Sequence, residues 1–147
     1  MPAIRVLVVD DYKEWQRSLQ SRLESEPDLE IIGVANNGLE GAEKAAELQP
    51  DLVLMDLHMP LMNGLAATRR IREVSPNSKV LFVTENSSLA LVSAAFEAGA
   101  CGYVLKSDSA DDLVPGIKAL SQNKKFVSHG LWGEIIHSSF YLDPPIQ

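Results

Sequence analysis

Residues 52–64 of the chain read LVLMDLHMPLMNG. The apolar run Leu52–Met55 predicts a buried strand, and Asp56 follows it directly. Pro60 and Gly64 then mark a loop, because both residue types interrupt regular structure. In open α/β sheets, ligands bind in the crevice outside the carboxyl ends of the strands. We therefore expect the Asp56 carboxylate to lie in such a crevice.

Other apolar runs also end in polar side chains. Ile4–Val9 is followed by Asp10 and Asp11, Val80–Val83 by Thr84, and Gly102–Leu105 by Lys106. With Asp56, these residues make a set of three acids, one hydroxyl and one ammonium at predicted strand ends. Carboxylate oxygens suit Mg²⁺, and a lysine ammonium is a compact charge that suits a phosphoryl oxygen. The pattern predicts a site for a divalent metal ion and a phosphoryl group.

The chain alternates short apolar runs with longer amphipathic stretches five times over. Strands are predicted at 4–9, 29–35, 51–55, 79–83 and 102–105, and helices at 12–24, 39–48, 64–74, 88–98 and 109–121. Strict alternation favours a parallel sheet with helices on both faces, and right-handed crossovers leave few topologies. We predict a flavodoxin-like, doubly wound α/β sheet of five strands in the order 2-1-3-4-5, with the strand-end residues at its switch point.

Three local features complete the structural prediction. Trp15, Leu19 and Leu23 form an apolar stripe that is typical of a helix packed on a core. Gly99 is expected to end its helix in the left-handed conformation. Ser109 is expected to cap the last helix at its N-terminus.

Composition narrows the class of protein. With 147 residues, 46% hydrophobic and 22% charged, the chain is typical of one globular domain. The net charge of −7 argues against generic nucleic-acid binding, because phosphate backbones attract basic surfaces. No apolar run approaches the roughly 20 residues that span a bilayer, and no secretory signal is evident. Cys101 is the single cysteine, which fits a cytoplasmic location, and we predict a small buried hydrophobe there.

Five segments of the chain form a recognisable set: Val8–Asp11, Pro50–Asp56, Met59–Gly64, Val83–Thr84 and Ala98–Lys106. Together they resemble the response-regulator receiver domain, the phosphoacceptor half of two-component signalling. In this order and at this spacing they are specific, and the resemblance covers about residues 3 to 124. The stretch AGACGY at 98–103 is most similar to the NarL/FixJ-type subfamily, whose members usually carry a DNA-binding helix-turn-helix after the receiver.

The resemblance implies a CheY-like fold and a role for each strand-end residue. Asp56 would be the phosphoacceptor. Asp11 would bind Mg²⁺ (or Mn²⁺) directly, Asp10 would bind it through water, and Asp56 would share the ion. The backbone carbonyl of His58 would complete the protein ligands. Lys106 would hold a phosphoryl oxygen and balance its charge.

The resemblance also implies a switch and a set of partners. Thr84 would bond the phosphoryl group, and the Tyr103 ring would fill the space that Thr84 leaves. The readout surface would comprise residues 88–98, 102–105 and 109–121. The partners would be a sensor histidine kinase or a phosphotransfer protein and an unknown output protein, with a homodimer as a further option. Catalysis would be limited to self-phosphorylation and self-dephosphorylation.

The predicted organisation is a receiver domain over residues 1–124 and a linker-like helix and tail over 125–147, without a DNA-binding domain. The tail carries a broad apolar stripe of Leu131, Trp132, Ile135, Ile136 and Phe140. This helix either packs on its own receiver or contacts a partner or second copy. His129 and His137 lack the spacing of metal ligands.

Three further functions compete with a single-domain receiver. The chain is alternatively the receiver portion of a NarL-type transcription regulator whose DNA-binding half is absent, or a pseudo-receiver that binds partners without phosphorylation. A haloacid-dehalogenase-type phosphatase also uses an Asp after a strand with Mg²⁺, but it needs a second Asp where this chain has His58. Glu85 departs from the receiver pattern, in which the residue after Thr84 is usually small, and we expect it to slow phosphorylation by small donors or to favour a particular kinase.

Overall fold

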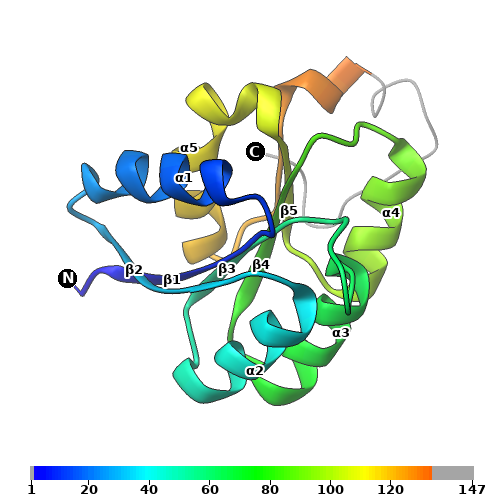
Figure 1. Cartoon of the computed structure of the whole chain (residues 1–147). Helices are drawn as coiled ribbons and strands as arrows, with labels where there is room; N and C mark the ends of the chain where they lie inside the picture. Colours follow the sequence, from blue (N-terminus) through cyan, green and yellow to red (C-terminus); the bar gives the residue numbers. More distant parts are fainter. Residues whose placement is uncertain (1, 134–147) are drawn as a thin grey trace.

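The computed structural model describes residues 2–133, which form one six-stranded parallel sheet with helices on both faces (Figure 1). The strand order is β2-β1-β3-β4-β5-β6. The strands are β1 (Ile4–Val9), β2 (Leu29–Ala35), β3 (Leu52–Met55), β4 (Lys79–Thr84), β5 (Gly102–Leu105) and β6 (Phe126–Val127). The helices are α1 (Lys13–Glu24), α2 (Gly38–Leu48), α3 (Gly64–Val74), α4 (Leu89–Ala98) and α5 (Ser109–Ser121), with 3₁₀ helices η1 (Lys106–Asp108) and η2 (His129–Leu131). The predicted fold class and the order of the first five strands are confirmed.

The sheet separates two hydrophobic cores, because successive side chains of a strand point to opposite faces. On β1, Leu7 and Val9 belong to one core, and Val6 and Val8 belong to the other. Helices α2, α3 and α4 cover the first, here the α2–α4 core, while α1 and α5 cover the second, the α1/α5 core (Figure 1). Both faces of β1 are therefore covered, as its unbroken apolar run predicts.

Side-chain caps and one glycine define several helix ends. Asn37 and Asn63 cap α2 and α3 by accepting backbone hydrogen bonds from the first turn of each helix. Gly99 ends α4 in the left-handed conformation, with φ of 114°, as predicted. The prediction that Ser109 caps the last helix is wrong, because η1 leads directly into α5 and Ser109 is its first helical residue. Its hydroxyl accepts a hydrogen bond from Arg22 instead.

A sixth strand is the main difference from the predicted five-stranded sheet. Phe126 and Val127 pair in parallel with Gly102 and Tyr103 of β5. The sequence placed them in a linker, because two apolar residues are too few to show a strand period. Leu131 is 1% exposed and packs in the α2–α4 core, so the chain that follows α5 is held on the sheet. The rest of the predicted tail helix, with Ile135, Ile136, His137 and Phe140, lies outside the described residues.

Two residues predicted to be buried are only partly so. Cys101 precedes β5 and packs at the margin of the α1/α5 core. Trp15 also packs at that margin, while Leu19 and Leu23 of the same stripe are buried as predicted. Trp15 lies near the start of α1, where the helix approaches the carboxyl ends of the strands, so part of its ring stays outside the core.

A transmembrane helix would need a long apolar segment. No helix within residues 2–133 is long and apolar enough to cross a bilayer.

Candidate functional site

Three carboxylates converge at the carboxyl ends of two neighbouring strands. Asp10 and Asp11 follow β1, Asp56 follows β3, and the two strands pair up to Val9 and Met55. One oxygen of each carboxylate lies within 4.8 Å of the others. Asp10 is buried, the Asp56 side chain is 12% exposed, and Asp11 is exposed. The structure thus brings together the three acids that were predicted to bind a metal ion.

Lys106 places its ammonium against this cluster. It is the first residue after β5, and its Nζ lies 3.0 Å from Asp10 Oδ2 and 4.0 Å from Asp56 Oδ2. The lysine side chain is 13% exposed, so salt and water screen these ion pairs less than they would at the surface. One ammonium is therefore shared between two acids, and it lies where a group bound to Asp56 would meet it.

The environment of Asp56 disfavours the ionised form of its carboxyl group. Burial, followed by the charge of Asp10, raises the pKa of Asp56 from its usual 3.8 to about 6. The Lys106 ammonium and the Leu57 amide, which donates to Asp56 Oδ1 at 2.9 Å, oppose this shift without cancelling it. A cation bound between the carboxylates would relieve the repulsion.

The donor set fits Mg²⁺. Carboxylate oxygens are the ligands that this ion prefers, and the exposure of Asp11 gives the ion access to the waters that it normally retains. Asp10, Asp11 and Asp56 are the residues that could hold it. His58, whose backbone carbonyl was predicted as a further ligand, is exposed and lines an open cleft together with Asp56.

The two residues predicted to form a switch both contact Asn86. Thr84 Oγ1 accepts a long hydrogen bond of 3.4 Å from the Asn86 amide, and the Tyr103 hydroxyl donates to the Asn86 carbonyl at 2.6 Å. The Tyr103 ring is buried in the α2–α4 core, where it stacks on Phe82 with ring centroids 6.1 Å apart, and burial raises the pKa of its hydroxyl. One loop residue therefore links the predicted switch hydroxyl to the predicted switch ring.

An open cleft of about 610 Å³ lies beside Asp56, Thr84 and Lys106. Its lining residues are Tyr12, Asp56, His58, Thr84, Glu85, Asn86 and Lys106. All three residues predicted to act in phosphoryl transfer, Asp56, Thr84 and Lys106, contribute to it. Glu85 is exposed and adds a further acid to the lining.

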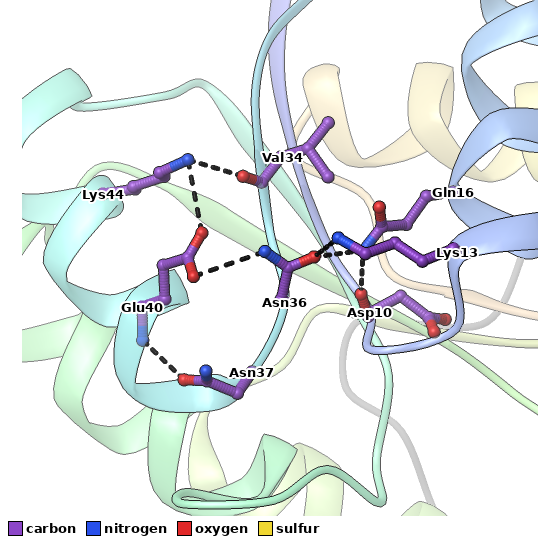
Figure 2. Close-up of polar contacts among 8 residues, drawn as sticks. All are labelled: Asp10, Lys13, Gln16, Val34, Asn36, Asn37, Glu40 and Lys44. Carbon is purple, nitrogen blue, oxygen red and sulfur yellow. Dashed lines mark hydrogen bonds and ion pairs between the residues drawn. The ribbon is translucent and has the colours of Figure 1, made fainter.

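Sequence reasoning missed a polar network behind Asp10 (Figure 2). Gln16 is 6% exposed, and its amide donates to the Asp10 carbonyl and, at 2.9 Å, to Asn36 Oδ1. Figure 2 shows the contacts continuing from Asn36 into α2. The available signal was the helical spacing of Gln16 with Leu19 and Leu23, which places a polar side chain among core positions. The network fixes the backbone of a predicted metal-binding residue.

A second polar cluster joins the chain after β6 to α5. His129 Nδ1 lies 2.6 Å from Asp112 Oδ2, and its Nε2 lies 3.6 Å from Asp108 Oδ1. Asp108 also accepts hydrogen bonds from the Ser128 hydroxyl and, at 3.0 Å, from the Gly130 amide. The hydrogen bond and charge of Asp112 raise the pKa of His129. Sequence spacing did not reveal this cluster, whose contacts hold η2 on α5.

Comparison with known sequences gives the family. The family model of the response regulator receiver domain matches residues 6–118. The transcriptional regulatory protein LnrK of Bacillus subtilis is 42% identical over 114 residues, which are 78% of this chain and 52% of LnrK. LiaR of the same organism is 36% identical over 133 residues, 90% of this chain and 63% of LiaR. The chain thus spans between half and two-thirds of the length of these relatives.

Solved structures agree with the sequence relatives. A two-component response regulator of the LuxR family from Aurantimonas sp. SI85-9A1 superposes with a TM-score of 0.87 at 32% identity, over 91% of this chain and 96% of that one. The response regulator domain of Thermotoga maritima CheB gives a TM-score of 0.77, also at 32% identity, over 82% of this chain and 97% of that one. The strand-end acids, the lysine and these likenesses lead to one conclusion: the chain belongs to the response regulator receiver family, and its close relatives are regulators of the LuxR/NarL type.

Proposed function

We propose that this chain is the phosphoacceptor of a two-component phosphorelay and that Asp56 is the acceptor. The observation that carries the proposal is the position of the Lys106 ammonium, within 4.0 Å of both Asp10 and Asp56 beside an open cleft. Phosphoryl transfer depends on positioning and on neutralisation of charge more than on covalent help from the protein. A clustered set of acids with one lysine offers both.

The proposed reaction starts when an Asp56 oxygen attacks the phosphorus of a phosphohistidine on a sensor kinase or phosphotransfer protein. A P–O bond forms, the P–N bond breaks, and the departing imidazole takes up a proton. Asp11 and Asp56 would hold Mg²⁺ (or Mn²⁺) directly, Asp10 would hold it through water, and His58 would do so through its backbone carbonyl. The bound ion supplies positive charge to the phosphoryl oxygens. Lys106 leaves Asp10 to bind a phosphoryl oxygen.

The phosphoryl group then biases a two-state switch. Thr84 bonds the new oxygen atoms, and the Tyr103 ring takes the space that the hydroxyl vacates. Their shared contact with Asn86 supports the coupling, because a movement of either side chain would alter a hydrogen bond to that residue. We propose that α4, β5 and α5 form the surface that an output protein or a second copy reads, and that the protein acts in the cytoplasm.

The second candidate is the receiver portion of a longer transcription regulator. It is favoured by the similarity to LnrK and LiaR, whose names describe transcriptional regulators and of whose length this chain covers only 52% and 63%. In that case the same switch surface would act on a DNA-binding half.

Intact-mass spectrometry tests the acceptor directly. After incubation with acetyl phosphate and Mg²⁺, we expect the wild-type chain to gain one phosphoryl mass and Asp56→Asn to gain none, because the amide cannot act as the nucleophile. Removal of Mg²⁺ with EDTA should suppress the gain.

Asp51→Asn is the matched control, because Asp51 is an exposed acid that precedes the same strand at its opposite end. It should be phosphorylated like the wild type. A mass gain in Asp56→Asn would overturn the assignment of the acceptor. No gain in any variant would favour a pseudo-receiver.

Glu85 is expected to slow small anionic donors. It is an exposed acid on the wall of the cleft that such a donor must enter. We expect Glu85→Ala to be phosphorylated by acetyl phosphate about two- to fivefold faster at low salt, with the difference shrinking as salt screens the charge. Glu85→Gln separates charge from size, because it keeps the volume of the side chain. The initial rates of phosphorylation are measured by intact-mass spectrometry. Equal rates in the wild type, Glu85→Ala and Glu85→Gln would contradict the expectation that Glu85 slows small donors.

A further inference from the structure

The Lys106 ammonium has an aromatic neighbour as well as its two acidic ones. Its Nζ lies 5.0 Å from the centroid of the Trp15 ring, 3.0 Å from Asp10 Oδ2 and 4.0 Å from Asp56 Oδ2. An ammonium within about 6 Å of an indole centroid is attracted by the negative face of the ring, more strongly where water is displaced. Because the lysine side chain is 13% exposed, this contact is largely shielded.

Trp15 contributes to this contact only through its ring. Its Nε1 is buried and has no hydrogen-bond partner within residues 2–133. A shielded indole N–H normally finds a partner, so hydrogen bonding does not explain the position of this side chain. The ring packs at the margin of the α1/α5 core and presents a face to the lysine. A phenylalanine would keep that face without losing a hydrogen bond, whereas a leucine would remove it.

The aromatic face differs from the acids in its charge. An acid that binds Lys106 competes with a phosphoryl group for the ammonium, and Asp10 in addition belongs to the predicted metal site. The indole is neutral, so it can retain the ammonium near the cleft when a cation occupies the acids. Trp15 comes from α1, and Lys106 is the first residue of η1, directly after β5, so this contact joins α1 to the carboxyl end of β5.

We propose that Trp15 is a positioning residue for Lys106. The Trp15 ring holds the ammonium beside Asp56 and keeps it available to the incoming phosphoryl group. This inference rests on the proposed function of Asp56 and Lys106. Without the contact to the Trp15 ring, Lys106 would pair more tightly with Asp10 or spend more time away from the cleft. In either case phosphoryl transfer would slow.

A double-mutant cycle tests the proposal through Lys106. Initial rates of phosphorylation by acetyl phosphate at saturating Mg²⁺ are measured by intact mass for the wild type, Trp15→Leu, Lys106→Met and the double variant. We expect Trp15→Leu to lower the rate about fivefold when Lys106 is present, which corresponds to roughly 1 kcal/mol of cation–π attraction. In the Lys106→Met background the same substitution should change the rate less than about twofold. Trp15→Phe should restore most of the rate.

A purely structural role would give a different result. Loss of packing at Trp15 would lower the rate by the same factor in both backgrounds, and that outcome would overturn the proposal. Trp132→Leu makes the same substitution at the second tryptophan, whose indole donates to the Val127 carbonyl in the segment after α5, and should leave the rate unchanged. A rate loss in Trp132→Leu as large as in Trp15→Leu would also count against the proposal.

Tryptophan fluorescence emission tests the contact between Trp15 and Lys106 without any phosphorylation. In a Trp132→Phe background, Trp15 is the only emitting indole. Adding Lys106→Met should alter its emission, whereas Lys118→Met, which removes a half-exposed lysine of α5, should not. Identical emission spectra for Lys106→Met and its parent would overturn the proposal that the Trp15 ring positions Lys106. A wild type that takes up no phosphoryl group would instead overturn the proposed function, and the emission would still decide whether Trp15 holds Lys106.

Discussion

Replacing Gly64 with alanine is expected to destabilise the fold by about 3 kcal/mol. A Cβ at this position would lie 2.2 Å from the Asp56 carbonyl oxygen and 2.8 Å from Phe82 Cε1. The carbonyl is backbone, so no side-chain rotation relieves the contact. The loop is also held by the Gly64 amide, which donates to the Leu57 carbonyl at 2.8 Å, so a shift of α3 would strain that bond. Urea unfolding followed by circular dichroism would measure the loss.

Gly133→Ala is the matched control for this substitution. Among residues 2–133, a Cβ at Gly133 would meet nothing within 4 Å, so alanine should be neutral or slightly stabilising there. An unchanged unfolding midpoint for Gly64→Ala would show that the loop after Asp56 is not as closely packed as the structure has it. A destabilisation in both variants would point to a general effect of the glycine substitution instead.

The second large effect concerns the charge of Asp56 itself. The pKa of Asp56 is about 6 in the folded chain and 3.8 ordinarily, because burial and the charge of Asp10 disfavour the ionised form. Stability that depends on the bound proton is fully present below pH 3.8 and is lost as the pH rises through about 6. About two pKa units correspond to roughly 3 kcal/mol. Ionised Asp56 therefore weakens the metal-free fold at neutral pH.

Asp56→Asn removes this cost, because its amide is neutral at every pH. We expect the variant to exceed the wild type in free energy of unfolding by about 1–3 kcal/mol at pH 7.5 in EDTA, and by close to zero near pH 4. Urea unfolding across this pH range would measure the difference. Saturating Mg²⁺ should narrow it at pH 7.5, since an ion that binds the folded wild type stabilises it. A difference that does not vary with pH would contradict the electrostatic origin.

The elements that the sequence predicted best are those with a clear hydrophobic period and a clear stop. The bounds of β1, β2, β5 and α3 match the structure. Helix α1 begins one residue later than predicted, because the Tyr12 amide donates to the Asp10 carboxylate at 2.8 Å and Tyr12 stays extended. Strand β6 was missed because only pairing with β5, brought close by the fold, makes two apolar residues a strand.

The composition of the candidate site followed from the sequence, but its supporting contacts did not. Asp10, Asp56 and Lys106 end predicted parallel strands, and such ends share one edge of the sheet. Trp15 and Gln16 are adjacent in sequence, yet one contacts Lys106 and the other the Asp10 carbonyl. Which of two neighbours faces the site depends on the rotation of α1 about its axis, and an apolar stripe defines that rotation too coarsely. The roles of the site residues stay predictions until the acceptor is tested.

The division of the interior by the sheet has a genetic consequence. Leu7 and Val8 are neighbours in the chain, but they pack in separate cores on opposite faces. Substitutions that share no contacts combine additively, whereas those that touch can compensate each other. A suppressor screen started from a defect at Val8 should therefore return second-site changes in α1 and α5, and one started at Leu7 should return changes in α2, α3 and α4. Each face of the sheet would then accumulate its own set of coupled mutations.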